Sequence, residues 1–299
     1  MRNMLKMIMK TLSGMMVLLL MVGCNQGADK IVIASKPMTE QFILAEILTQ
    51  LIEDRTDLVV EQKLGIGGGT SNIHPAMING EIDVYPEYTG TGWLFVLQQD
   101  SISDMNELYE KVSIAYLEEF NIVWSSMYGF NNTYGLAISK DVAEAYDIKT
   151  YSDLATVSSE LVFAANPDFY EREDGYNALV EMYNFTFKDT KEIDIGLRYE
   201  ALSSDDVDII TVFTTDARIN EENVVIIEDD RTYFNAYHGA TLIRKEVLDE
   251  NPGLFDVLEL LANQISNEEM IAMNYEVEIE NKDPKVVASE FLREKGLIE

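Results

Sequence analysis

Short β-type segments alternate with helix-type segments near the start of the chain, and this alternation is the sequence feature that most constrains the fold. Residues 30–35, 58–64 and 81–85 have the pattern of strands. Between the first two, apolar side chains keep helical spacing over residues 42–52, with Thr39 as the expected N-cap. The order β-α-β-α-β favours a largely parallel sheet, which is an α/β architecture.

A glycine-rich turn joins the third of these strands to a run of small polar residues. Residues 67–93 are GGGTSNIHPAMINGEIDVYPEYTGTGW. Glycines allow backbone segments to approach closely, and Pro86 cannot continue a strand ladder. In open α/β sheets, ligands bind beyond the carboxyl ends of the strands. We therefore expect Tyr88, Thr89 and Thr91 to line a cleft.

The middle of the chain has the pattern of a second α/β lobe, and the last part returns to the first. Residues 129–140, GFNNTYGLAISK, run from a glycine and asparagine turn into a new strand and indicate a crossing. Residues 241–244 have the pattern of a returning strand, followed by helical segments that should pack on the first lobe. Two lobes with two crossings predict a hinged cleft that closes around a small ligand.

The N-terminus has the features of a lipoprotein signal. Basic residues precede an apolar run at residues 15–22, which is too short to span a bilayer as a mature helix. Residues 21–24, MVGC, resemble a lipobox. We therefore expect residues 1–23 to be a signal peptide, Cys24 to be lipidated, and residues 24–29 to form a tether that holds the protein outside the cytoplasmic membrane. The alternative is an uncleaved anchor with an incidental cysteine.

Charge and residue types exclude several classes of function. The chain has 53 acidic and 22 basic side chains and a net charge of -31. Nucleic acid is not expected as a partner, because phosphate contacts need a basic face. Cys24 is the only cysteine, and His74 and His238 lie in no zinc or nucleophile motif. We expect no enzyme activity, no cofactor and no metal.

Five segments resemble, in the same order, segments of the substrate-binding proteins of ABC transporters for glycine betaine, carnitine and choline. The resemblance implies an α/β, two-lobed, type II periplasmic-binding-protein-like fold with a ligand cleft between the lobes. It implies a lobe formed by residues 30–128 and 232–299, and a second lobe formed by residues 129–231. The five segments are KPMTEQ at 36–41, YPEYTGT at 85–91, NTY at 132–134, REDGY at 172–176 and FTTDAR at 213–218.

The function implied by this resemblance is the capture of a quaternary-ammonium osmolyte for uptake. The protein would be a monomer that delivers its ligand to separate ABC permease subunits with a cytoplasmic ATPase. Two alternatives remain: a ligand-sensing lipoprotein with the same cleft, and a protein that binds a different small amine or an amino acid. The preferred ligand among glycine betaine, proline betaine, carnitine and choline is left open.

A trimethylammonium group has no N–H donor, so a protein must surround it with aromatic ring faces. Each ring contributes about 0.5 to 2 kcal/mol of cation-π attraction. The resemblance places Tyr88, Tyr134, Phe213 and Tyr237 in such a cage, and related proteins usually have tyrosine at the position of Phe213. For each ring, the alternative role is ordinary core packing.

The resemblance also implies which residues bind a ligand carboxylate. Lys36 and Arg172 would face it, and the Thr91 hydroxyl would be a further donor. Thr89 and Asn132 are secondary candidates that could instead hold turns. The alternative for each cation is a surface ion pair. Choline lacks a carboxylate and would leave the two cations unpaired, so we expect zwitterions to bind better than choline.

Overall fold

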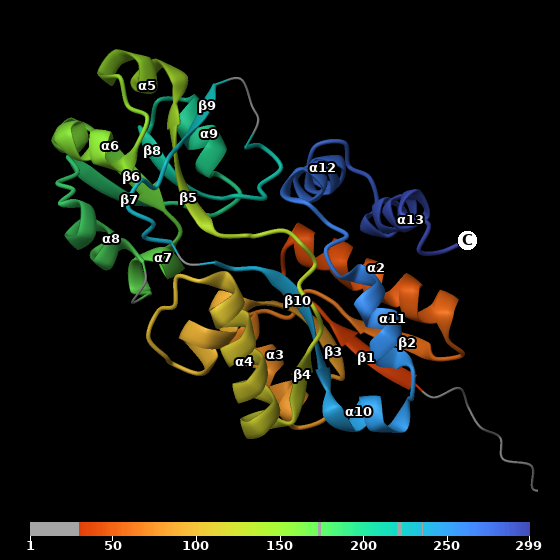
Figure 1. Cartoon of the computed structure of the whole chain (residues 1–299). Helices are drawn as coiled ribbons and strands as arrows, with labels where there is room; N and C mark the ends of the chain where they lie inside the picture. Colours follow the sequence, from red (N-terminus) through yellow and green to blue (C-terminus); the bar gives the residue numbers. More distant parts are fainter. Residues whose placement is uncertain (1–29, 173–174, 220–222, 235) are drawn as a thin grey trace, which may run out of the picture.

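The computed structural model describes residues 30–172, 175–219, 223–234 and 236–299. The predicted signal peptide, Cys24 and the tether lie outside the described residues. Figure 1 shows two lobes, each built on one five-stranded sheet with helices around it. No helix in the described part of the chain is long and apolar enough to cross a membrane.

The first sheet has the strand order β2-β1-β3-β10-β4. Strand β1 is parallel to β2 and β3, whereas β10 is antiparallel to both of its neighbours, β3 and β4. The predicted parallel arrangement is therefore confirmed for the first three strands, and the returning strand enters in the opposite direction. The bounds are β1 (Lys30–Ala34), β2 (Val59–Lys63), β3 (Val84–Tyr88), β4 (Ile122–Trp124) and β10 (Gly239–Arg244).

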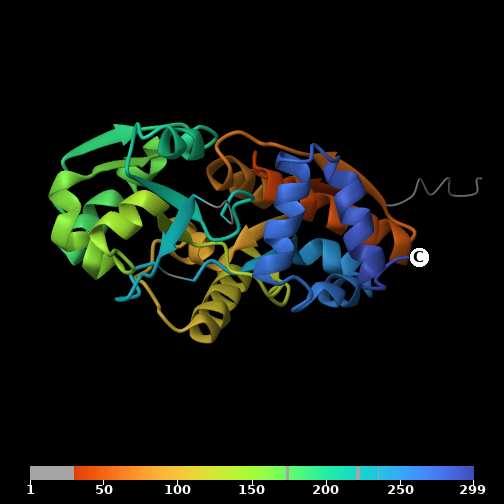
Figure 2. The same ribbon diagram turned by 90° about the horizontal axis from the view of Figure 1, so that it is seen from above.

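Helix α2 (Thr39–Arg55) is the centre of the helical layer in this lobe. Helices α11, α12 and α13, from the end of the chain, all pack against it, and Figures 1 and 2 show α12 and α13 beside it. Its apolar residues between Ile43 and Ile52 are fully buried between these helices and the sheet. The other helices of this lobe are α3 (Thr70–Ile78), η1 (Thr91–Val96), α4 (Met105–Phe120), α10 (Lys245–Glu250), α11 (Leu254–Leu258), η3 (Glu259–Leu261), α12 (Asn267–Glu278) and α13 (Pro284–Glu294).

The predicted N-cap of α2 is wrong by one residue. Met38 occupies the cap position with an extended backbone and makes no side-chain capping bond, and Thr39 is the first helical residue. The Met38 carbonyl accepts hydrogen bonds from the amides of Gln41 and Phe42. Thr39 is therefore one residue past the position from which a side chain caps a helix.

The second sheet has the strand order β7-β6-β8-β5-β9. Strand β6 is parallel to β7 and β8, whereas β5 is antiparallel to β8 and β9. The strands are β5 (Tyr134–Ser139), β6 (Val162–Ala165), β7 (Asp189–Glu192), β8 (Ile209–Phe213) and β9 (Val224–Ile227). The helices are α5 (Lys140–Tyr146), α6 (Tyr151–Val157), η2 (Ser158–Glu160), α7 (Pro167–Glu171), α8 (Tyr176–Tyr183) and α9 (Arg198–Ser203).

Two connections join the sheets, one at residues 125–133 and one at residues 228–238. They lie side by side at the crossing, where Asn131 forms a β-bridge with His238 and the Asn132 amide donates to the Tyr237 carbonyl at 3.0 Å. A pair of adjacent chain segments of this kind is a suitable hinge.

His74 on α3 is buried by aromatic rings. Its ring centroid lies 5.4 Å from that of Tyr116 and 4.7 Å from that of Phe120, and its nitrogens have no hydrogen-bond partner among the described residues. Burial lowers the pKa of His74, and the negative charge of Glu87 acts in the opposite direction. The residue therefore packs as a neutral ring.

We expect His74 to make the protein less stable as the pH falls from 7 toward 5. Below the unfolded pKa of about 6.5 the unfolded chain gains a proton that the folded state resists, so the free energy of unfolding falls until the pH passes the lowered folded pKa. One such group changes it by at most about 1.4 kcal/mol per pH unit. Urea unfolding of the wild type and His74→Phe at several pH values measures this. A wild-type slope that the variant retains in full would contradict the expectation.

Candidate functional site

Tyr134 and Phe213 form an aromatic surface at the end of the second sheet. The two residues are directly opposite in the pairing of β5 with β8, and their ring centroids are 4.8 Å apart. Phe169 and Phe234 extend the group, with centroids 5.1 Å and 5.8 Å from that of Tyr134. The structure thus brings together the two predicted cage residues of the second lobe.

Arg172 connects this surface to Tyr237 on the other side of the crossing. Its guanidinium carbon lies 5.8 Å from the centroid of the Tyr134 ring, and its Nη2 donates to the Tyr237 hydroxyl at 3.0 Å. The Tyr237 amide in turn donates to Asn131 Oδ1 at 2.6 Å. Arg172 therefore lies within reach of two other predicted ligand residues, Tyr134 and Tyr237.

Gly90 leaves the space that the Tyr237 ring occupies. A Cβ at residue 90 would lie 2.7 Å from Tyr237 Cε1 and 2.9 Å from the Ala236 carbonyl oxygen. Thr91, which is half-buried, follows as the first residue of η1. The glycine of the sequence YTGT therefore leaves the room that the Tyr237 ring needs.

We expect Gly90→Ala to weaken ligand binding, because the Tyr237 ring and the backbone of residue 236 must shift to admit the methyl group. A displacement of this kind costs about 1 to 3 kcal/mol, which is about 5- to 150-fold if it falls on the bound state. Calorimetric titration measures the change. Gly67→Ala is the control, because its Cβ would meet no atom within 4 Å. Equal affinity in the two variants would show that the Tyr237 position is not required.

Lys36 and Tyr88 form a separate, buried group in the first lobe. The Lys36 ammonium is ion-paired with Glu87 and lies 4.7 Å from the centroid of the Tyr88 ring. Glu87 is fully buried and also accepts hydrogen bonds from the Thr70 hydroxyl at 2.6 Å and the Tyr88 amide at 2.8 Å. The Lys36 charge is thus already balanced inside the protein.

The Tyr88 hydroxyl is hydrogen-bonded to a second buried carboxylate, that of Glu40. It donates to Glu40 Oε1 at 2.5 Å and accepts from Gln41 Nε2 at 3.0 Å. Asn132 Nδ2 donates to the same Glu40 oxygen at 2.8 Å. Burial raises the pKa of Glu40, and hydrogen bonds from neighbouring side chains, Thr215 first, act in the opposite direction.

The two secondary candidates hold the crossing in place. The Thr89 hydroxyl accepts from the His238 amide at 3.1 Å and donates to the Ala236 carbonyl at 3.3 Å, so it fixes β3 to the returning segment. Asn132 reaches Glu40 as described above. In this structure both side chains therefore have structural partners.

Sequence reasoning missed several charged residues next to the predicted cage. Arg198, on α9, is ion-paired with Asp216, and its guanidinium carbon lies 5.0 Å from the centroid of the Phe213 ring. Burial raises the pKa of Asp216, and the Arg198 charge acts in the opposite direction. Glu40 and Asp216 belong to the segments KPMTEQ and FTTDAR, so the resemblance of those segments to the family could have identified them as site residues. Arg198 lies in no such segment.

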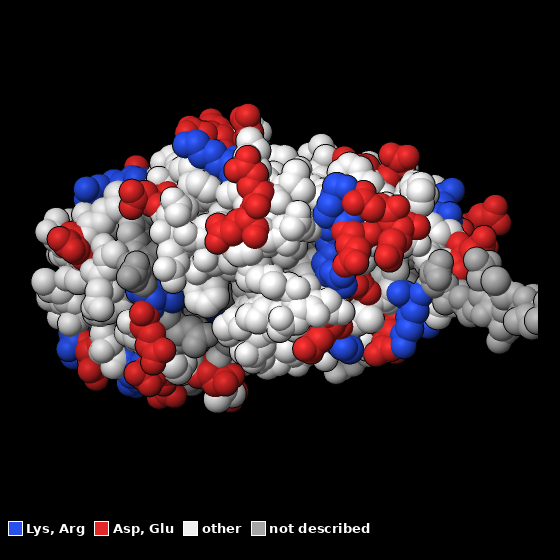
Figure 3. Space-filling view, turned by 90° about the horizontal axis from the view of Figure 1, so that it is seen from below, with Lys and Arg blue, Asp and Glu red and all other residues white. Residues whose placement is uncertain are grey.

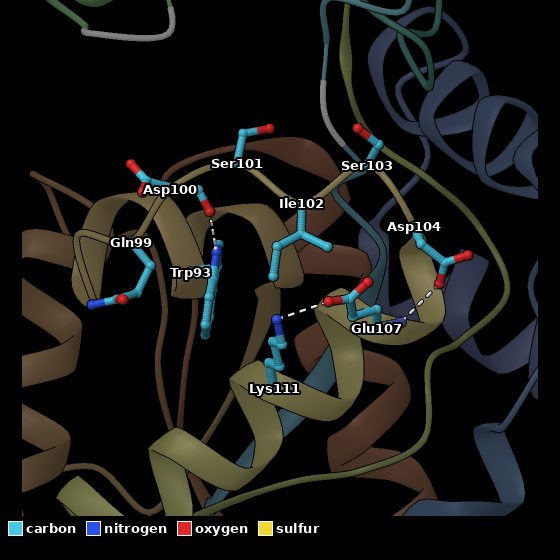
Figure 4. Close-up of a pocket in the computed structure, with 9 residues that line it drawn as sticks. All are labelled: Trp93, Gln99, Asp100, Ser101, Ile102, Ser103, Asp104, Glu107 and Lys111. Carbon is cyan, nitrogen blue, oxygen red and sulfur yellow. Dashed lines mark hydrogen bonds and ion pairs between the residues drawn. The ribbon is translucent and has the colours of Figure 1, made fainter.

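A hollow of about 540 Å³ lies on the first lobe, between η1 and the start of α4 (Figure 4). Trp93 Nε1 donates to the Asp100 carbonyl at 2.7 Å, and Lys111 pairs with Glu107 at 2.7 Å. None of the predicted cage residues lines it. Its lining residues are Trp93, Gln99, Asp100, Ser101, Ile102, Ser103, Asp104, Glu107 and Lys111.

The surface charge agrees with the composition. Figure 3 shows one face of the molecule, on which acidic side chains lie in several groups and basic side chains in smaller patches among them. Among the described residues, no group of three or more His, Cys, Asp or Glu side chains is arranged to hold a metal ion.

Comparison with known proteins identifies the family. The model of the substrate binding domain of the ABC-type glycine betaine transport system, OpuAC, matches residues 29–294. The chain belongs to this family. The resemblance to substrate-binding proteins of ABC transporters for glycine betaine, carnitine and choline is therefore confirmed, and with it the role of substrate-binding component of an ABC transporter.

Two relatives of this OpuAC-family chain have informative names. The ergothioneine transport permease/ergothioneine binding protein EgtU of Helicobacter pylori (strain G27) is 43% identical over 267 residues, which are 89% of this chain and 48% of that protein. The chain thus spans about half the length of this relative. The carnitine transport binding protein OpuCC of Listeria monocytogenes is 36% identical over 277 residues, or 92% of this chain and 90% of that protein.

A solved structure confirms the fold. The crystal structure of a glycine betaine/carnitine/choline ABC transporter protein superimposes with a TM-score of 0.80 at 28% identity, covering 91% of this chain and all of the other. The α/β, two-lobed fold of type II periplasmic binding proteins, predicted from the sequence, is therefore confirmed.

Proposed function

We propose that this protein captures a zwitterionic quaternary ammonium compound outside the cytoplasmic membrane and delivers it unchanged to an ABC permease with its ATPase. The observation that carries the proposal is the convergence of Arg172, Tyr134 and Tyr237 at the crossing between the lobes. Ring faces attract a trimethylammonium group, and a guanidinium binds a carboxylate through two parallel hydrogen bonds. These are the two ends of a betaine.

Residues from both lobes contribute to this arrangement. Tyr134 and Phe213 belong to the second sheet, whereas Tyr237 lies on the segment that returns to the first. A ligand held between them would draw the lobes together, and a permease could then distinguish the loaded form from the empty form.

We propose glycine betaine and related osmolytes as the first candidate ligands and ergothioneine as the second. Ergothioneine is favoured by the 43% identity to a protein named for it. It shares the trimethylammonium and carboxylate groups of glycine betaine and adds a sulfur-bearing imidazole ring. The proposed cage and Arg172 bind the trimethylammonium and carboxylate groups that the two ligands share. The imidazole ring of ergothioneine would need further room in the cleft.

Calorimetric titration of the purified protein with glycine betaine, carnitine, ergothioneine and choline tests the proposal. We expect at least one zwitterion to bind with saturation and choline to bind about 10- to 100-fold more weakly, which is the effect of one unpaired charged hydrogen-bond partner. Binding of choline as tightly as the best zwitterion would reject the carboxylate assignment. Binding of none of the four would reject the ligand class.

We further propose that Cys24 carries a lipid that holds a monomer at the outer face of the membrane. The support is the apolar run at residues 15–22 followed by the lipobox-like residues 21–24. Transport by a partner permease, and not signalling, is supported by the match to a transport-system family.

A further inference from the structure

Glu40 is a buried carboxylate surrounded by hydrogen-bond donors. It lies in the first turn of α2 and is 4% exposed. Its Oε1 accepts from the Tyr88 hydroxyl at 2.5 Å and Asn132 Nδ2 at 2.8 Å, and its Oε2 accepts from Asn274 Nδ2 at 3.4 Å. The start of a helix also favours a negative charge.

All of these partners donate, so the site fits a carboxylate and not an amide. The Tyr88 hydroxyl accepts from Gln41 Nε2, which directs its own hydrogen toward Glu40. A glutamine in place of Glu40 would have one acceptor oxygen and one NH₂ group, and the NH₂ group would face a donor on Asn132 or Asn274. An unsatisfied buried donor is costly.

The partners of Glu40 come from different parts of the fold. Tyr88 ends β3 in the first lobe, Asn132 lies in the first connection, and Asn274 is on α12. Asn274 Nδ2 also donates to the Thr215 carbonyl at 2.8 Å. Thr215 follows β8 of the second lobe and is two residues beyond Phe213, so the Glu40 group links both halves of the predicted cage.

We propose that Glu40 is a positioning residue that fixes the Tyr88 ring for the ligand and couples it to the contact between the lobes at Asn274 and Thr215. This inference rests on the proposed function for its ligand-binding part. A ligand that stacks on the Tyr88 ring shifts the Tyr88 hydroxyl, which is bonded to Glu40. Glu40 then shifts its other partners, Asn132 at the crossing and Asn274, which contacts the turn after β8.

Glu40→Gln tests the proposal, with Glu46→Gln as the matched control. Glu46 is a buried glutamate on the same helix, and its carboxylate accepts from Gln62 Nε2 at 3.0 Å on the side of β2. We expect Glu40→Gln to weaken binding of the best zwitterion about 10- to 100-fold, the effect of lost hydrogen bonds to a charged group, and the control to change it less than about threefold. Equal effects in the two variants would overturn the proposal.

A milder variant addresses the link through Tyr88 alone. Tyr88→Phe keeps the ring and removes the hydroxyl, so it should weaken binding about 3- to 10-fold and add little to Glu40→Gln in the double variant. If the losses of binding free energy in the two single variants add up in the double variant, Glu40 does not act on the ligand through Tyr88. If Glu40→Gln does not fold, Tyr88→Phe serves as the test in its place.

A measurement without ligand separates this proposal from the proposed function. Hydrogen exchange of the ligand-free proteins should be faster in Glu40→Gln than in Glu46→Gln at residues 213–217 and 131–134, because the link between the lobes is weakened. Unchanged exchange at both segments would overturn the coupling even if betaine binds. Faster exchange, when the wild type binds none of the four ligands, would support the coupling and reject the ligand class.

Discussion

Arg172→Gln is expected to lower the affinity for glycine betaine about 10- to 100-fold while the affinity for choline changes less than about threefold. Arg172 is the cation that contacts both Tyr134 and Tyr237, so it is the natural partner of a ligand carboxylate bound beside the cage. The other predicted carboxylate partner, Lys36, is buried in an ion pair with Glu87. The selectivity for zwitterions should therefore largely disappear.

Calorimetric titration of wild type and variant with both ligands measures this selectivity. Arg231→Gln is the control, because Arg231 also lies over a tyrosine ring of the second lobe, with its guanidinium carbon 5.2 Å from the centroid of Tyr183. If Arg172→Gln lowers the affinity for glycine betaine and for choline equally, the Arg172 side chain shapes the site without pairing with the carboxylate.

Tyr134→Leu is expected to weaken the binding of every quaternary ammonium ligand by about 10- to 30-fold, because a ring face worth about 2 kcal/mol in a desolvated site is lost. Choline and glycine betaine should be affected alike, since both have the trimethylammonium group. The melting temperature should fall as well, because Tyr134 packs against Phe169, Phe213 and Phe234.

Phe163→Leu separates affinity from stability. Phe163 is fully buried in the same aromatic core, with its ring 4.9 Å from that of Phe187, but it is not a cage residue. Phe163→Leu should lower the melting temperature without changing the affinity for either ligand. If Tyr134→Leu lowers the melting temperature and leaves both affinities intact, Tyr134 is a core residue only.

The sequence predicted the arrangement of the lobes because hydrophobic periodicity and turn residues are local signals. The strands near residues 30–35 and 58–64 and the return at β10 are present. The third strand was wrong in its bounds, because β3 runs over Val84–Tyr88 and Pro86 lies inside the strand opposite Thr241. The direction of β10 was not predictable, since a strand has the same pattern in a parallel or an antiparallel pairing. The start of α2 was missed by one residue, since Met38 and not Thr39 occupies the cap position.

The candidate site was less accessible to sequence reasoning, because its charges are paired over long distances. The sequence predicts that Lys36 is a ligand partner or a surface ion pair, and the structure shows a buried pair with Glu87, fifty-one residues away in the chain. Phe169 and Phe234 have no local feature that separates a cage neighbour from a core residue. Phe169 lies on α7 and Phe234 in the second connection, so only the fold of the lobe brings these rings to Tyr134.

The position of β10 has a consequence for the order in which the lobes are completed during synthesis. Strand β10 lies between β3 and β4 in the first sheet, yet residues 239–244 are made after the whole second sheet. The strands of the second sheet lie between residues 134 and 227 and pair with no strand that is made later. We therefore expect the second lobe to become protease-resistant first, while the first lobe waits with a gap in its sheet for the end of the chain.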